Sequence, residues 1–192
     1  MLAKSKIRGY KLSQMSVEVA NNRALDIVTS TLDKLDLKEA SSDLVIVGGA
    51  VLAVCGIKPI ENTDLDIAVT ERLKYHLGFD KRWIKPDDQS IAVAEGGISV
   101  RIGDTYDGFR TVEGDVTAFT NDFDDIYKVP IEELLAEADI PEGSHYQFSP
   151  LLRVLDWKAA LANASEYKGD KRKHIRDIQR ISRHLLKKSK ST

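Results

Sequence analysis

The chain alternates between stretches whose apolar residues recur at helical spacing and short runs that are apolar throughout. Apolar residues three or four positions apart predict an amphipathic helix over residues 17–35. Residues 44–47 form a continuous apolar run that ends at a pair of glycines, a pattern typical of a strand buried on both faces. Residues 64–69 predict a second strand. A short helix over residues 50–54 is expected between these two strands.

The remainder of the chain changes from short strands to helices. A short helix is predicted over residues 71–77, and strand-like runs at 90–93 and 98–102 flank Glu95-Gly96-Gly97, which indicates a hairpin. The segment from Gly103 to Gly108 is interpreted as a loop. Helices are then predicted over residues 131–138, 150–164 and 172–186.

This order of elements predicts an α/β fold, with a small mixed sheet flanked by helices and a helical C-terminal part. We divide the chain into an N-terminal arm and helix (residues 1–42), an α/β core (43–130) and a C-terminal helical part with a basic tail (131–192). Since domains average roughly 150 residues, we expect these segments to pack as one unit.

Charge is distributed very unevenly, although the 192 residues carry a formal net charge of only −2. Residues 104–142 hold twelve acidic and two basic side chains, whereas residues 168–190 hold ten basic and two acidic ones. Such a basic tail attracts nucleic acid through counterion release. The alternative is a solvated helix face that complements the acidic middle of the chain.

The remaining composition predicts an ordinary cytoplasmic protein. The longest apolar stretch, residues 44–57, contains three glycines in 14 residues and is too short to span a membrane. No apolar block follows the basic N-terminus, so a secretory signal is not expected. The lone cysteine, Cys55, is interpreted as a core residue, and Trp83 and Trp157 are interpreted as packing residues.

The candidate chemistry lies at the glycine pair and at a D-x-D sequence on the next strand. Gly48 and Gly49 allow a polyphosphate to approach the backbone, where the helix that follows offers unpaired N–H groups. Asp64 and Asp66 alternate with apolar residues and therefore project from one face of their strand, about 7 Å apart. Two carboxylates so placed suit Mg²⁺, or Mn²⁺, bound together with substrate phosphates.

These residues resemble the nucleotidyltransferase superfamily, which includes polymerase-β-like enzymes, tRNA CCA-adding enzymes and AbiEii-type toxins. The match consists of Val47-Gly48-Gly49, fourteen intervening residues and Asp64-Leu65-Asp66-Ile67. The opening is most similar to that of CCA-adding enzymes, but Leu52 stands where that family has arginine. The resemblance implies a polymerase-β-like fold, with nucleotide contacts at Gly48, Gly49, Ala50 and Thr63.

A second resemblance, to small AbiEii-like nucleotidyltransferases, lies near the C-terminus. Lys158 matches a helical lysine of that group, and Asp177 matches an acid of a later basic helix in which His174 replaces the first acid. The resemblance implies that Lys158 neutralises triphosphate charge. It also implies that Asp177 positions a lysine or activates the acceptor.

A third carboxylate is usual in this superfamily on a later strand. The face of the 98–102 strand that should carry it holds Ser99 and Arg101. Asp104 and Asp115 are substitutes by proximity in sequence, and a site with no third carboxylate is the other alternative.

The sequence therefore predicts a Mg²⁺-dependent nucleotidyltransferase that moves a nucleoside monophosphate from an NTP to an acceptor. The acceptor could be RNA, such as tRNA bound through residues 168–190, or another protein or a small molecule. One alternative is a non-catalytic nucleotide- or RNA-binding module on the same fold, and another is a toxin–antitoxin component with a protein partner. No membrane association is expected.

Overall fold

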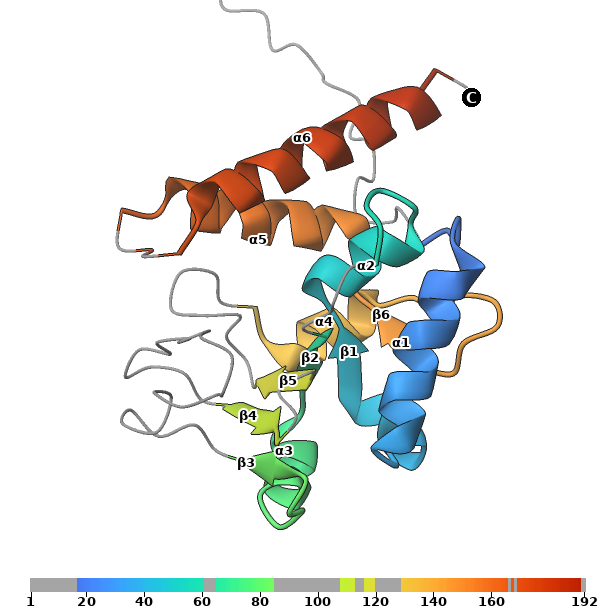
Figure 1. The fold of residues 1–192 in the computed structure, drawn as a ribbon, viewed down its shortest axis with the longest axis vertical. Coiled ribbons are helices and arrows are strands. Elements are labelled where there is room, and N and C mark those ends of the chain that lie inside the picture. The colour runs from blue at the N-terminus through green and yellow to red at the C-terminus, as the bar shows by residue number, and fades with distance from the viewer. Residues whose placement is uncertain are drawn as a thin grey trace, which may run out of the picture.

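The computed structural model describes residues 17–60, 65–84, 108–112, 116–119, 129–165, 167 and 169–190. These residues form an α/β protein with a mixed sheet and a C-terminal helical pair (Figure 1). The helices are α1 (Asn22–Lys34), η1 (a 3-10 helix, Lys38–Asp43), α2 (Gly48–Val54), α3 (Glu71–Leu77), α4 (Ile131–Glu137), α5 (Leu151–Asn163) and α6 (Lys171–Lys188). The strands are β1 (Leu44–Ile46), β2 (Leu65–Val69), β3 (Trp83–Ile84), β4 (Gly108–Thr111), β5 (Val116–Phe119) and β6 (Gln147–Phe148).

The described strands form one sheet in the order β3-β4-β5-β2-β1-β6. β2 lies at its centre, antiparallel to β1 and parallel to β5. β1 also pairs in parallel with β6, and β3, β4 and β5 are joined by antiparallel pairing. Both parallel and antiparallel pairs therefore occur, as the predicted mixed sheet requires.

Helices cover both faces of the central strands. Leu65, Ile67 and Val69 of β2 belong to a large buried cluster with residues of α1 and α2. Ala68 faces the other way and packs in a second cluster with Trp157 and with residues of α4 and α5. The apolar face predicted for this strand is confirmed, but its second face is also buried at Ala68, because β2 is a central strand.

The C-terminal helical pair shares the core of the rest of the chain. Leu32, Ile46 and Ile181 come from the three predicted segments, and all three belong to one buried cluster with no exposed surface. In Figure 1, α5 and α6 lie across one end of the molecule beside α2, and α3 and β3 lie at the opposite end. The predicted helix over residues 172–186 is therefore a packed element (α6).

The first helix begins later than its apolar spacing predicts. The prediction was residues 17–35, whereas α1 starts at Asn22. The side chain of Asn21 accepts a hydrogen bond from the N–H of Ala24 (3.1 Å) and caps the helix. The N–H groups of Ala20 and Asn21 both donate to the carbonyl of Val54. Residues before Asn22 are thus bonded to the end of α2 and cannot also extend α1.

The limits of the other helices and strands agree with the predictions only in part. The helix predicted over residues 71–77 is confirmed, while α2 begins at Gly48 and not at residue 50. β4, β5 and β6 were not predicted, and Gly108, interpreted as loop, starts β4. Strands of two to four residues are defined by their hydrogen-bond pairing and are too short to show a pattern of apolar residues from which they could be predicted. The strands predicted at 90–93 and 98–102 lie outside the described residues.

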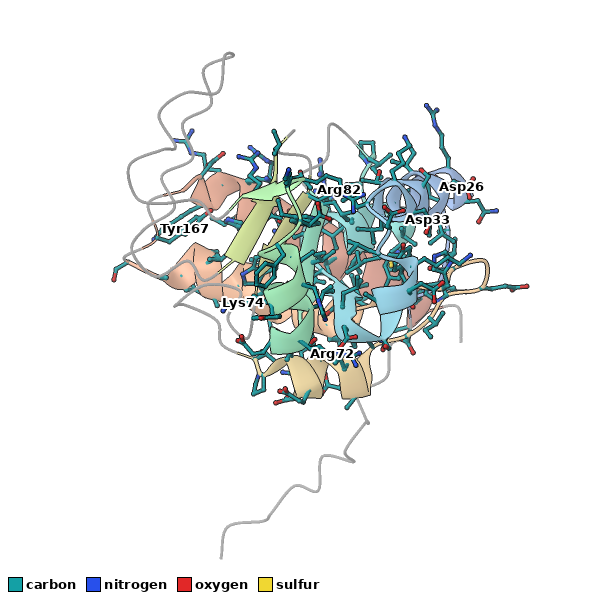
Figure 2. The ribbon with its side chains drawn as sticks, turned by 90° about the horizontal axis from the view of Figure 1, so that it is seen from below. Asp26, Asp33, Arg72, Lys74, Arg82 and Tyr167 are labelled. Carbon is teal, nitrogen blue, oxygen red and sulfur yellow. The ribbon has the colours of Figure 1, made fainter. Side chains whose placement is uncertain are left out.

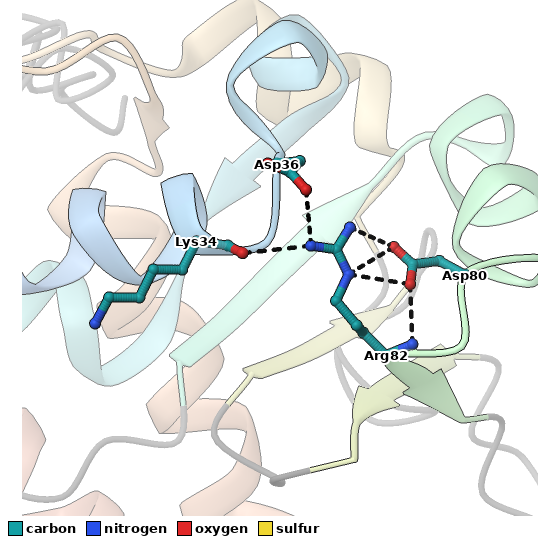
Figure 3. Close-up of polar contacts among 4 residues, drawn as sticks. All are labelled: Lys34, Asp36, Asp80 and Arg82. Carbon is teal, nitrogen blue, oxygen red and sulfur yellow. Dashed lines mark hydrogen bonds and ion pairs between the residues drawn. The ribbon is translucent and has the colours of Figure 1, made fainter.

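One surface network joins the end of α1 to the segment between α3 and β3. The guanidinium of Arg82 donates to both carboxylate oxygens of Asp80, to Asp36 (2.9 Å) and to the carbonyl of Lys34 (Figure 3). These bonds hold the pKa of the Asp80 carboxyl below its usual range. The network connects two segments that are far apart in the sequence and so stabilises the fold.

The structure bears on two further predictions, the burial of Cys55 and the absence of a membrane-spanning helix. Cys55 is buried in the large apolar cluster, as predicted, and its burial raises the pKa of the thiol to about 11. None of the helices in the described part of the chain has the length and apolar character needed to cross a membrane.

Candidate functional site

The candidate site is built around the turn that joins β1 to α2. Gly48 has a φ of +65°, in the left-handed region that favours glycine. The N–H of Val47 donates to the carbonyl of Asp66 (3.0 Å), which continues the pairing of β1 with β2 up to this turn. The strand pairing therefore brings the glycine pair beside the D-x-D strand.

The side chain of Asp66 lies against this turn. A Cβ at Gly48 would stand 2.8 Å from Oδ2 of Asp66 and 3.0 Å from the ring of Trp157. Only a residue without a side chain fits there, on grounds of space and of backbone conformation. Asp66 itself is partly exposed, so it lies at the edge of the core.

Lys158 reaches this site from α5. Its side chain is buried, with 5% of its surface exposed, and its Nζ lies 4.5 Å from the centre of the Trp157 ring. Burial lowers the pKa of Lys158 to about 8, while the carboxylates of Asp66 and Asp177 oppose that shift. The structure thus brings the predicted Gly48, Asp66, Lys158 and Asp177 together. Trp157 packs in the core as predicted but also borders the site.

A second lysine, Lys58, was not predicted. A Cβ at Gly49 would stand 2.8 Å from the Nζ of Lys58, so this ammonium lies against the second glycine of the turn. Burial lowers the pKa of Lys58, and Asp177 and Asp66 oppose that effect. Its sequence neighbourhood indicated only a break at Lys58-Pro59. The one available signal was a basic residue close behind an otherwise apolar segment.

α6 contributes two buried polar side chains, Asp177 and His174, with 3% and 5% of their surfaces exposed. Oδ1 of Asp177 lies 3.8 Å from the Arg180 guanidinium, and its Oδ2 has no hydrogen-bond partner among the described residues. Nε2 of His174 lies 2.8 Å from the hydroxyl of Tyr167, which Figure 2 places beside the α5–α6 pair. Burial and the nearby Lys158 lower the pKa of His174 to about 4, so the ring is neutral at neutral pH.

Several predicted site residues cannot be placed. Thr63, Asp64, Asp104 and Asp115 lie outside the described residues. Ala50 is described, but its side chain packs in the large apolar cluster, so only its backbone could contact a ligand. The predicted pair of carboxylates is therefore represented here by Asp66 alone.

The neighbours of Asp66 in the sheet bear on the third carboxylate. On β5 the Cα partner of Asp66 is Thr117, and the partner of Thr117 on β4 is Arg110. The described positions level with Asp66 on these two strands thus hold a hydroxyl and a guanidinium. Within the part of the chain that the structure describes, no group of three His, Cys, Asp or Glu residues could hold a metal ion. Asp66 offers one hard oxygen ligand of the kind that Mg²⁺ prefers.

The outer face of α6 is strongly basic. Ile181, His174 and Asp177 form its buried side, which leaves the following cations exposed: Arg172, Lys173, Arg176, Arg180, Arg183 and Lys187. Arg176 lies 3.8 Å from Asp170 at the start of the helix. The basic tail is therefore a solvated helix face on a packed helix, and this face adjoins the site at Arg180, which lies 3.8 Å from Asp177.

Together, the fold and the site define an α/β protein in which a glycine turn, two carboxylates and two lysines converge near the end of β1, beside a basic C-terminal helix. Comparison of the chain with protein-family models, curated proteins and solved structures gives no match.

Proposed function

We propose that the protein is a Mg²⁺-dependent nucleotidyltransferase that moves a nucleoside monophosphate from an NTP to an acceptor. The observation that carries this proposal is the convergence of Gly48, Asp66, Lys158 and Asp177, which come from four different elements. The sequence resemblance had already assigned these four residues to one site. A shared site is the simplest reason for residues so far apart in the chain to meet.

In the proposed reaction, an acceptor hydroxyl attacks the α-phosphorus of the NTP. The bond from that phosphorus to the bridging oxygen of the β-phosphate breaks, and pyrophosphate leaves with the bonding electron pair. Asp64 and Asp66 would hold Mg²⁺, which offsets the negative charge of the reacting phosphates. The backbone of the Gly48-Gly49 turn would contact the phosphates, and Lys58 and Lys158 would add positive charge. Asp177 positions these lysines or takes the proton of the acceptor.

RNA is the acceptor that the charge distribution favours. The exposed cations of α6 follow one helix face that begins close to Asp177, and phosphate backbones bind such faces through counterion release. A protein or a small-molecule acceptor would not need this face.

A second candidate function is supported by the residues beside Asp66. Thr117 and Arg110 stand level with it on β5 and β4, where an acid could have completed a three-carboxylate site. This favours a non-catalytic module that binds nucleotide or RNA without turnover. The two functions differ in one measurable property, the release of pyrophosphate.

The test is incubation of the purified protein with each α-labelled NTP and total RNA, with and without Mg²⁺. We expect label to appear in the acceptor, together with pyrophosphate, only when Mg²⁺ is present. Asp66→Asn should abolish transfer, and Asp26→Asn, at an exposed position on α1, is the matched control. Binding of NTP without pyrophosphate release would establish the second candidate instead. Transfer at full rate by Asp66→Asn would refute the proposed site.

A further inference from the structure

The two lysines beside the glycine turn differ in their surroundings. Lys158 is buried, its ammonium lies over the Trp157 ring, and the carboxylates of Asp66 and Asp177 favour its charge. A buried ammonium needs such partners, because an unpaired charge in the interior is costly. The charge of Lys158 is therefore already favoured by two carboxylates of the protein itself.

Lys58 is placed differently. It is only partly buried, and its Nζ lies against the backbone of Gly49, the second glycine of the turn. Its own backbone is held, since the N–H groups of Ile57 and Lys58 both bond to the carbonyl of Leu52 (2.9 and 3.4 Å). The loop after α2 thus turns back and directs a lysine to the start of the same helix.

The charges around Lys58 favour an anion. Two carboxylates, Asp177 and Asp66, favour its charged form, while Lys173 and Arg180 oppose it and Lys158 lies within the same group. Among the described residues these cations outnumber the carboxylates. A phosphate group beside Lys58 would relieve the repulsion among the cations and would accept hydrogen bonds from the ammonium.

We propose that Lys58 is the residue that contacts the polyphosphate of the substrate, and that Lys158 is a positioning residue that holds Asp66 and Asp177 in place. This assignment rests on the proposed function. The sequence resemblance implies that Lys158 neutralises the triphosphate. The present assignment gives that role to Lys58, in the loop after α2. The ligand class is a polyphosphate, either free or as part of an NTP.

The test measures binding of inorganic tripolyphosphate and of NTP by titration calorimetry in the presence of Mg²⁺. Lys58→Met keeps the apolar stem and removes the charge, and Lys58→Gln is a second variant should the first fold poorly. We expect either to weaken tripolyphosphate binding by roughly 10- to 100-fold, the effect of one lost charge-assisted hydrogen bond. Lys58→Arg should restore most of the affinity, and Lys34→Met, at an exposed position on α1, should bind like the unmodified protein.

Lys158→Met provides the comparison. We expect it to lower the melting temperature, because it removes the buried cation that faces Asp66 and Asp177. Its folded fraction should lose less tripolyphosphate affinity than Lys58→Met. If Lys58→Met binds like the unmodified protein while Lys158→Met loses binding, the inference is wrong and the proposed function stands. If the unmodified protein binds neither tripolyphosphate nor any NTP, both are wrong.

Discussion

The carboxylate of Asp66 occupies the space that a side chain on Gly48 would need. Its Oδ2 lies 2.8 Å from the position of the absent Cβ, although the two residues belong to different elements, β2 and α2. The glycine therefore does two things at once. It permits a left-handed backbone at the end of β1, and it allows the strand that carries Asp66 to approach the turn.

The glycine pair should be unequal in its tolerance of substitution. Gly48→Ala combines a left-handed φ, which costs about 1–2 kcal/mol, with overpacking against Asp66 and Trp157, which costs about 1–3 kcal/mol. Gly49→Ala meets only the flexible end of Lys58 and lies outside the left-handed region, so it should cost about 1 kcal/mol or less. Chemical denaturation of both variants measures the difference. Equal destabilisation would contradict this account of the turn.

A comparison of two aspartates tests whether the proposed site has a third carboxylate. Leu65 and Val116 are Cα partners in the parallel pair of β2 and β5, and in the sequence Asp64 directly precedes the first and Asp115 the second. We therefore expect Asp115→Asn to lower transfer activity by roughly 100-fold or more, as loss of a group that stabilises the reacting charges does. Asp104→Asn should stay close to full activity. The reverse result would assign the role to Asp104, and two active variants would indicate a site without a third carboxylate.

His174 should make the protein sensitive to mild acid. Its folded-state pKa of about 4 lies below the value of 6.5 for an unperturbed histidine, so between these values the unfolded chain binds the proton and the folded protein does not. Stability should therefore fall as the pH is lowered from about 6.5 toward 4, by up to roughly 3 kcal/mol from this group. His174→Gln should flatten that part of the profile of unfolding free energy against pH. His76→Gln, at an exposed position on α3, is the control, and an unchanged slope in His174→Gln would show that another group is responsible.

The basic face of α6 should affect RNA binding separately from nucleotide binding. Replacing Arg172, Arg176 and Arg183 together by Gln should weaken RNA binding. The slope of log K against log salt concentration should become shallower by about 0.7 for each lost contact with single-stranded RNA. NTP affinity should stay the same, since these three side chains point outward from the helix. The control is the double variant Lys34→Gln and Lys38→Gln, which removes two exposed positive charges outside α6. An unchanged salt dependence in the α6 variant would exclude this face as the RNA contact.

The sequence by itself determined the elements that have a strong local pattern. The helix over residues 71–77 and the cores of α1, α5 and α6 follow from apolar residues at helical spacing, and β1 follows from its continuous apolar run. The grouping of Gly48, Asp66, Lys158 and Asp177 as candidate site residues also came from the sequence, through the resemblance. Each of these inferences depends on residue type and short-range order, which a sequence displays directly.

Only the tertiary structure decided which side chains are buried and which meet. Helical spacing places His174 and Asp177 on the side of α6 that carries Ile181, but their burial depends on how α6 packs on α5. Lys58 belongs to the site because its loop folds back on α2, a contact that no periodicity encodes. The short strands β4, β5 and β6 likewise exist through hydrogen bonds to distant partners. Long-range pairing fixes these features, and the spacing of residues along the chain does not record it.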